Sequence, residues 1–231
     1  LVLTAIIAAS LFGALGKDPV EGLTMFFVEP WSNLRQVSEV LLKATPLIVI
    51  ALGLAVCYRS NVWNIGAEGQ YLLGILGGGG VALWLTTQGL QLSQFVTVPL
   101  VLIGGALGGM AWAGITALLR DKFNASEILV SLMLVYVAQQ LVNYMVFGPW
   151  KDPRAFGFPQ TKNFDPSTWL PNLLGGTRLH IGFVVALVLV GLIWVFMFRM
   201  YRGYQLQVGG LAPAAARYAG FSASTSLWTA L

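Results

Sequence analysis

The sequence predicts an all-α fold, a polytopic transmembrane helical bundle with at least six spans. Of the 231 residues, 57% are hydrophobic and only 10% are charged, whereas about 25% of the residues of a soluble domain are charged. A soluble protein of this size needs a polar surface, but a protein in a bilayer keeps an apolar surface against lipid. The apolar residues also gather in runs long enough to cross a hydrocarbon core about 30 Å thick.

Six apolar runs follow one another, each near the roughly 20 residues that a spanning helix needs. They cover residues 1–16, 39–57, 66–87, 95–119, 126–147 and 180–199. A transmembrane barrel is excluded because its strands alternate apolar and polar residues, while these runs are apolar on all sides. The chain starts inside one apolar run and stops at Leu231 as another begins. We therefore expect a single transmembrane domain, 1–231, truncated at both ends.

The basic residues lie at the ends of the apolar runs, which is typical of topology signals rather than of a nucleic-acid site. Short cytoplasmic loops are enriched in such residues, so segments 58–65, 120–125 and 200–222 are expected inside. Segment 148–178 then lies outside. Its five prolines prevent a long helix, and we expect an ordered loop with short helical turns. The basic residues of the inside segments are Arg59, Arg120, Lys122, Arg202 and Arg217.

Glycines concentrate within the runs 66–87 and 95–119. Small residues four positions apart let two helix backbones approach closely, in a solvent where the hydrophobic effect does not drive helix association. Packing within one chain is the favoured interpretation, and a dimerisation face is the alternative. The spaced pairs are Gly74 with Gly78, Gly104 with Gly108, and Gly105 with Gly109.

Segment 59–70 interrupts the apolar pattern where one span ends and the next begins. In the structural interpretation, Asn64 caps a helix and Glu68 complements the positive end of the helix dipole. In the functional interpretation, the helix starts part-way into the membrane, and Glu68 and Gln70 line a translocation path, as broken helices do in transporters. Both interpretations stay open.

The string Asn64-Ile-Gly-Ala-Glu-Gly-Gln70 resembles a motif of ABC importer permeases of the simple sugar and nucleoside type, whose relatives move ribose and branched-chain amino acids. Segments 124–138 and 148–153 resemble the nucleoside branch of that family. Segment 201–220 resembles the cytoplasmic coupling segment that docks on the ATPase. The resemblance runs from about Leu41 to the end of the chain. It implies the same orientation that the basic residues favour. It also implies that the chain is a fragment of a larger permease.

The resemblance places the cytoplasmic coupling segment at 200–222. Pro213 suits the first turn of a short helix, the small residues after it allow close docking, and Arg217 offers a charge to a partner. Without the resemblance, an ordinary amphipathic loop is the simpler interpretation. The candidate coupling residues are Gly210, Pro213, Ala215, Arg217 and Gly220.

Polar residues within the run 126–147 are unusual for a membrane span. They either hold helices together by hydrogen bonds or face a wet cavity. Together with the polar residues of segment 59–70, they are the expected substrate contacts. The candidates are Asn64, Glu68, Gln70, Tyr136, Gln139 and Asn143.

The resemblance implies a transport subunit, not an enzyme, that moves a small polar solute by alternating access in a bacterial inner membrane. The sequence contains no Gly-Lys-Ser nucleotide loop, metal-binding histidine pair or serine elbow. We therefore expect no cofactor or metal on this chain, and ATP on a partner subunit. The implied partners are ABC ATPase subunits, a second permease subunit, identical or homologous, an extracytoplasmic solute-binding protein and the lipid bilayer.

Nucleosides are the expected substrate because of segment 148–153, with simple sugars or branched-chain amino acids as alternatives. Two other classes stay open. An ion-coupled secondary transporter would need paired ionisable residues within the membrane, and Glu68 has no evident partner in the sequence. A membrane-embedded enzyme would need clustered catalytic residues, and none is apparent.

Overall fold

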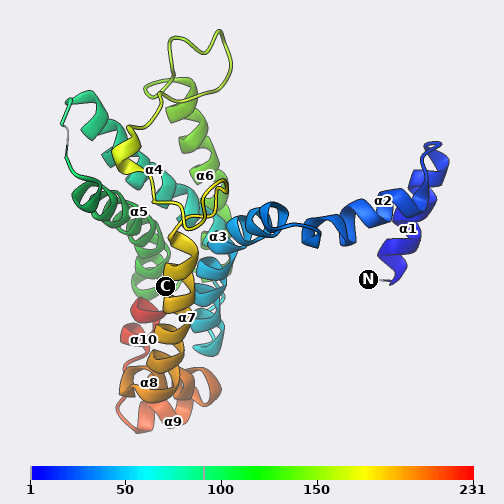
Figure 1. Ribbon diagram of the computed structural model, residues 1–231. Helices are drawn as coiled ribbons and strands as arrows, with labels where there is room; N and C mark the ends of the chain where they lie inside the picture. The colour runs from blue at the N-terminus through cyan, green and yellow to red at the C-terminus, as the bar shows by residue number, and fades with distance from the viewer. Residues whose placement is uncertain (1, 91) are drawn as a thin grey trace. The chain divides into compact units, whose positions relative to one another are not determined.

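A computed structural model describes residues 2–90 and 92–231, and within these ranges the secondary structure is helical, with isolated bridges but no strand (Figure 1). The all-α prediction is confirmed. Two single 3-10 turns, η1 (Glu29–Trp31) and η2 (Pro166–Thr168), accompany the α-helices. The α-helices are α1 (Val2–Ala14), α2 (Pro19–Phe27), α3 (Leu34–Arg59), α4 (Ala67–Thr87), α5 (Gln94–Phe123), α6 (Glu127–Phe147), α7 (Gly182–Arg199), α8 (Tyr201–Leu211), α9 (Pro213–Tyr218) and α10 (Ala223–Ala230).

Four helices of the described chain are long and apolar enough to cross a membrane, namely α3, α5, α6 and α7. The other two predicted spans are helices as well, but they do not meet both requirements. Helix α1 has 13 residues, which is about 20 Å at 1.5 Å per residue. Helix α4 has 21 residues, but its glycines and its polar first turn lower its hydropathy. The structure thus supports a multi-pass helical membrane protein with four candidate spans, not the six expected.

The chain divides into two compact units. Unit 1 comprises Leu1–Ile48 and Pro171–Leu187. In it, Arg178 binds Glu39 near the start of α3 through two hydrogen bonds, from Nε to Oε1 at 2.8 Å and from Nη2 to Oε2 at 2.5 Å. This hydrogen bonding raises the pKa of the Arg178 guanidinium. Because water reaches both groups, the pair contributes only modest stability.

Unit 2 comprises Val49–Leu170 and Val188–Leu231. Its centre is the contact between α4 and α5, where the two backbones touch at glycines. A Cβ atom on Gly74 would lie 3.3 Å from the carbonyl oxygen of Gly105, and one on Gly105 would lie 3.2 Å from that of Gly74. A Cβ atom on Gly108 would lie only 2.5 Å from the Leu73 carbonyl oxygen. The predicted intrachain packing of the glycine pairs is confirmed. Helix α4 packs on its other side against α6.

The part of the loop after α6 that belongs to unit 2, up to Leu170, is tied to α4 and α5. Gln94 Nε2 donates to the Trp169 carbonyl at 2.5 Å, and the Asp165 N–H donates to Thr86 Oγ1 at 3.3 Å. Asp165 also accepts the Ser167 N–H at 2.9 Å and so begins the turn η2. This bonding lowers the pKa of Asp165. The prediction of an ordered loop with short helical turns is confirmed.

One end of unit 2 holds α8, α9 and α10 (Figure 1). A cavity of about 290 Å³ lies there, and its lining comes from all three segments that the sequence analysis assigned to one side of the membrane. The lining residues from those segments include Ser60, Asn61, Arg120, Asp121, Gly209, Pro213 and Arg217. The fold therefore brings together the three segments that the distribution of basic residues had grouped.

Replacing Gly108 with alanine is expected to lower the melting temperature of the detergent-solubilised protein. The added methyl group would force α4 and α5 apart, which costs about 1–3 kcal/mol for overpacking. Gly53→Ala on α3 is the matched control because a Cβ atom there meets nothing within 4 Å. Equal melting temperatures for the two variants would contradict the close contact between the backbones.

Candidate functional site

The segment between α3 and α4, residues 60–66, is called the polar break below. Helix α3 ends when Asn61 adopts the left-handed conformation, with φ of 54°. The Val62 N–H then donates to the Cys57 carbonyl at 2.9 Å and the Asn61 N–H to the Tyr58 carbonyl at 3.1 Å. This is the bonding pattern of a Schellman motif, which satisfies the last carbonyls of a helix. The motif thus pairs the Cys57 and Tyr58 carbonyls at the end of α3.

Asn64 organises the second half of the polar break. Its side chain is almost fully buried, with 3% exposed. Oδ1 accepts the Gly66 N–H at 3.0 Å, and Nδ2 donates to Gln70 Oε1 at 3.2 Å. The predicted helix cap is wrong in detail, because Gly66 is the N-cap of α4 and Asn64 binds a backbone group before the helix. Glu68 does lie in the first turn of α4, as predicted.

The polar break is fastened to α6 by Ser131. The Ile65 N–H donates to Ser131 Oγ at 3.1 Å, and this hydroxyl donates to the Ile128 carbonyl at 3.2 Å. A Cβ atom on Gly66 would lie 2.7 Å from the Ser131 carbonyl oxygen, and one on Gly69 would lie 3.1 Å from Val135 Cα. The glycines of the motif therefore let the chain lie directly on α6. No local sequence pattern indicated this role of Ser131.

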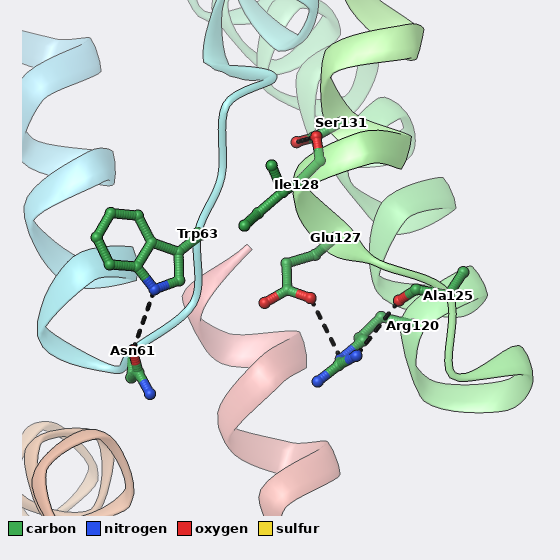
Figure 2. A network of polar contacts seen from close by, with 7 residues as sticks. All are labelled: Asn61, Trp63, Arg120, Ala125, Glu127, Ile128 and Ser131. Carbon is green, nitrogen blue, oxygen red and sulfur yellow. Dashed lines mark hydrogen bonds and ion pairs between the residues drawn. The ribbon is translucent and has the colours of Figure 1, made fainter.

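The connection between α5 and α6 lies beside the polar break (Figure 2). Asn124, with φ of 50°, ends α5 in the left-handed conformation. Arg120 Nε lies 3.3 Å from Glu127 Oε2, so the last turn of α5 is paired with the first turn of α6. Glu127 lies in the first turn of α6, where it complements the helix dipole, and the ion pair adds a second reason for its position.

A cavity of about 650 Å³ opens within unit 2, between α3, α4, α5, the loop after α6, and the last residues of the chain. Pockets for small organic molecules have volumes of about 300–1,000 Å³ and mainly apolar walls with few polar groups. Two candidate residues, Asn64 and Gln70, line this cavity. Its aromatic lining comes from Tyr71, Phe164 and Trp169.

The other candidates for substrate contact lie outside this cavity, on an exposed surface called the α6 polar face below. Gln139 Nε2 lies 3.5 Å from Glu68 Oε1, so Glu68 has a partner that the sequence did not reveal. Tyr136 is 64% exposed. The α6 residues follow one another at intervals of three and four, which places them on one side of the helix. The members of the α6 polar face are Glu68, Tyr136, Gln139 and Asn143.

The candidate coupling residues spread over α8, α9 and the turn that follows. Pro213 is the first residue of α9, as predicted, and Ala215 and Arg217 are exposed on that helix. Gly220 follows with φ of 77°. Gly210 instead packs against the end of α3, where a Cβ atom would overlap the Arg59 carbonyl oxygen. The segment is therefore two short helices, with Ala212 as the junction.

Two strongly exposed apolar side chains of this region were missed by the sequence analysis. Tyr218 is 98% exposed and Leu211 is 86% exposed. No group of three or more potential metal ligands occurs among the described residues.

Comparison with known proteins identifies the family to which the chain belongs. The profile of a family described as branched-chain amino acid transport system, permease component, matches residues 36–231. The chain belongs to this permease family. Its relatives include a glucose ABC transporter permease of Haloferax volcanii, which is 35% identical over 97% of this chain and 61% of that protein. The predicted resemblance to ABC permeases of the simple sugar and nucleoside type is confirmed.

Two further relatives of this permease chain are named for nucleosides. A guanosine ABC transporter permease of Bacillus subtilis is 28% identical over 99% of this chain and 66% of that protein. A nucleoside ABC transporter permease of Lactococcus lactis is 27% identical over 97% of this chain and 64% of that protein. The chain thus spans less than two thirds of the length of these three relatives. No solved structure matches it significantly.

Replacing Ser131 with alanine is expected to destabilise the permease by about 1–3 kcal/mol, because the Ile65 N–H loses its acceptor. Thermal unfolding in detergent measures the change. Ser38→Ala is the matched control, since both serines are 1% exposed but Ser38 bonds only to the Arg35 carbonyl of its own helix. If the two variants unfold at the same temperature, Ser131 does not hold the polar break.

Proposed function

We propose that the chain is the transmembrane permease subunit of an ABC importer that moves a nucleoside across the inner membrane by alternating access. The family match over residues 36–231 is the observation that carries this proposal. The relatives named as ABC transporter permeases support it. The ATP is hydrolysed on separate ATPase subunits, and an extracytoplasmic binding protein delivers the solute.

The proposed solute path combines the two groups of candidate residues. Asn64 and Gln70 offer amide groups inside the large cavity, next to aromatic rings that suit a nucleoside base. The α6 polar face lies on a candidate span, where polar side chains exposed to lipid are costly. We place a second permease subunit against this face, so that the polar side chains border the path between the two subunits.

The proposed membrane topology has at least six spans in a single permease domain, 1–231. Helix α4 packs between α5 and α6, and this shielding from lipid permits its glycines and polar first turn. Helix α1 is apolar throughout its 13 described residues apart from Thr4 and Ser10. In this arrangement α8 and α9, within 200–222, form the cytoplasmic coupling segment that contacts the ATPase.

Simple sugars are the second candidate for the substrate. The glucose permease relative is more similar to this chain than the two nucleoside relatives, at 35% against 28% and 27% identity. The nucleoside assignment is favoured by the resemblance of segment 148–153 and by the aromatic lining of the cavity. Branched-chain amino acids are named in the description of the family and form a third class.

The function is tested by uptake into proteoliposomes that contain the full-length permease, its ATPase and its binding protein. We expect uptake of radiolabelled guanosine or adenosine only when ATP is present inside the vesicles. Glucose, ribose and leucine serve as competitors at about tenfold excess over the nucleoside. At this ratio, a competitor that binds about tenfold more weakly than the nucleoside still reduces nucleoside uptake. Uptake without ATP would contradict an ABC importer, and competition by leucine alone would contradict the nucleoside assignment.

Glu68 tests the transport class in the same vesicles. Glu68→Gln keeps the oxygen that accepts from Gln139 and is expected to retain uptake within about threefold, since the loss of a partly exposed charge is a small change. Glu68→Leu removes the hydrogen bond and places an apolar group on the path, so uptake is expected to fall. An ion-coupled transporter that uses Glu68 would lose uptake in both variants.

A further inference from the structure

Helix α8 lies against the end of α3 through a contact between backbones. A Cβ atom on Gly210 would overlap the Arg59 carbonyl oxygen and would lie 2.9 Å from the Ser60 carbonyl carbon. The neighbouring Gly209 is different, because a Cβ atom there would lie 3.8 Å from the Ser226 Oγ, which is an ordinary distance. Only Gly210 of this pair must remain without a side chain.

The rest of α8 is also fixed to the membrane helices. Leu206, 2% exposed, packs with Val56 of α3 and Met197 of α7. Gln207 Nε2 donates to the Met197 carbonyl at 2.5 Å. A Cβ atom on Gly203 would overlap the Phe196 carbonyl oxygen, so this glycine too permits a close approach. Helix α8 is thus in close contact with the ends of both α3 and α7.

The contact at Gly210 lies where the polar break begins. Ser60 is its first residue and is 8% exposed, and Asn64 follows four positions later. The Ile65 N–H, directly after Asn64, donates to Ser131 of α6, and the Asn64 side chain bonds to Gln70 of α4. No flexible side chain separates α8 from this backbone, so a displacement of α8 bears directly on the polar break.

We infer that Gly210 is a positioning residue that transmits movement of the coupling segment to Asn64 and Gln70 in the solute cavity. This inference rests on the proposed function, since it takes α8 and α9 as the segment that the ATPase moves. It differs from a docking role, because Gly210 faces the end of α3. An added methyl group would shift α8 relative to the polar break and so weaken the coupling between ATP hydrolysis and transport.

The test compares Gly210→Ala with Gly209→Ala in the reconstituted importer and measures the amount of solute moved per ATP hydrolysed. We expect this ratio to fall about tenfold in Gly210→Ala, within the range of energetic coupling between distant sites, and to stay near the wild-type value in Gly209→Ala. General loss of folding lowers uptake and hydrolysis together and leaves the ratio unchanged. Equal ratios in the two variants would overturn the inference.

A second measurement applies if Gly210→Ala does not assemble. Spin labels are attached to cysteines at Trp63 and Tyr218, which are 50% and 98% exposed, in a Cys57→Ser background diluted with unlabelled chain. The distance between the labels is measured without nucleotide and with ATP trapped. We expect it to change by less than about 3 Å, because packed segments move as rigid bodies. A larger change would separate the coupling segment from the polar break and overturn the inference.

The two hypotheses fail in different ways. If the wild-type complex shows no ATP-driven uptake, the proposed function is wrong. If it does transport solute but Gly210→Ala behaves like Gly209→Ala, only the role of Gly210 is wrong.

Discussion

Buried backbone N–H and C=O groups must find hydrogen-bond partners, because an unpaired one costs about as much free energy as a lost hydrogen bond. The polar break between α3 and α4 meets this constraint with side chains and with the end of α3. Val62 bonds back to Cys57, Ile65 to Ser131 and Gly66 to Asn64. Cys57 belongs to α3 and Ser131 to α6, and the Asn64 side chain also bonds to Gln70 of α4, so the interruption ties all three helices together. The bond from Asn64 Nδ2 to Gln70 Oε1 holds these two side chains together in the lining of the cavity.

Glycine gives unit 2 its compact centre and also the close contact of α8 with α3 and α7. Along α4 and α5 the glycines remove side chains from the surfaces that meet, so van der Waals contact between backbones replaces the hydrophobic effect, which is weak in lipid. At Gly210 and Gly203 the same device brings α8 against α3 and α7. In contrast, Gly53 and Gly191 have open space around them, so the presence of glycine alone does not identify a contact.

The candidate substrate contacts separate into two places because of helix geometry. Glu68 and Gln70 are two positions apart on α4, and residues at that spacing point to different sides of a helix. Gln70 therefore joins Asn64 in the cavity, while Glu68 lies near Gln139 of the α6 polar face. One group lies in a cavity inside a single chain, and the other lies on an exposed surface.

The sequence by itself determined the helical class, the approximate bounds of the membrane helices and the family motif. Hydropathy and proline or glycine signals are local, so α6 was predicted within one residue and Pro213 was placed at the start of α9. Only the tertiary structure decided that Ser131 holds Ile65, that Glu68 meets Gln139 and that Gly210 touches the end of α3. These partners lie at least 66 residues apart in the chain, and the packing of whole helices, which no local pattern encodes, brings them together.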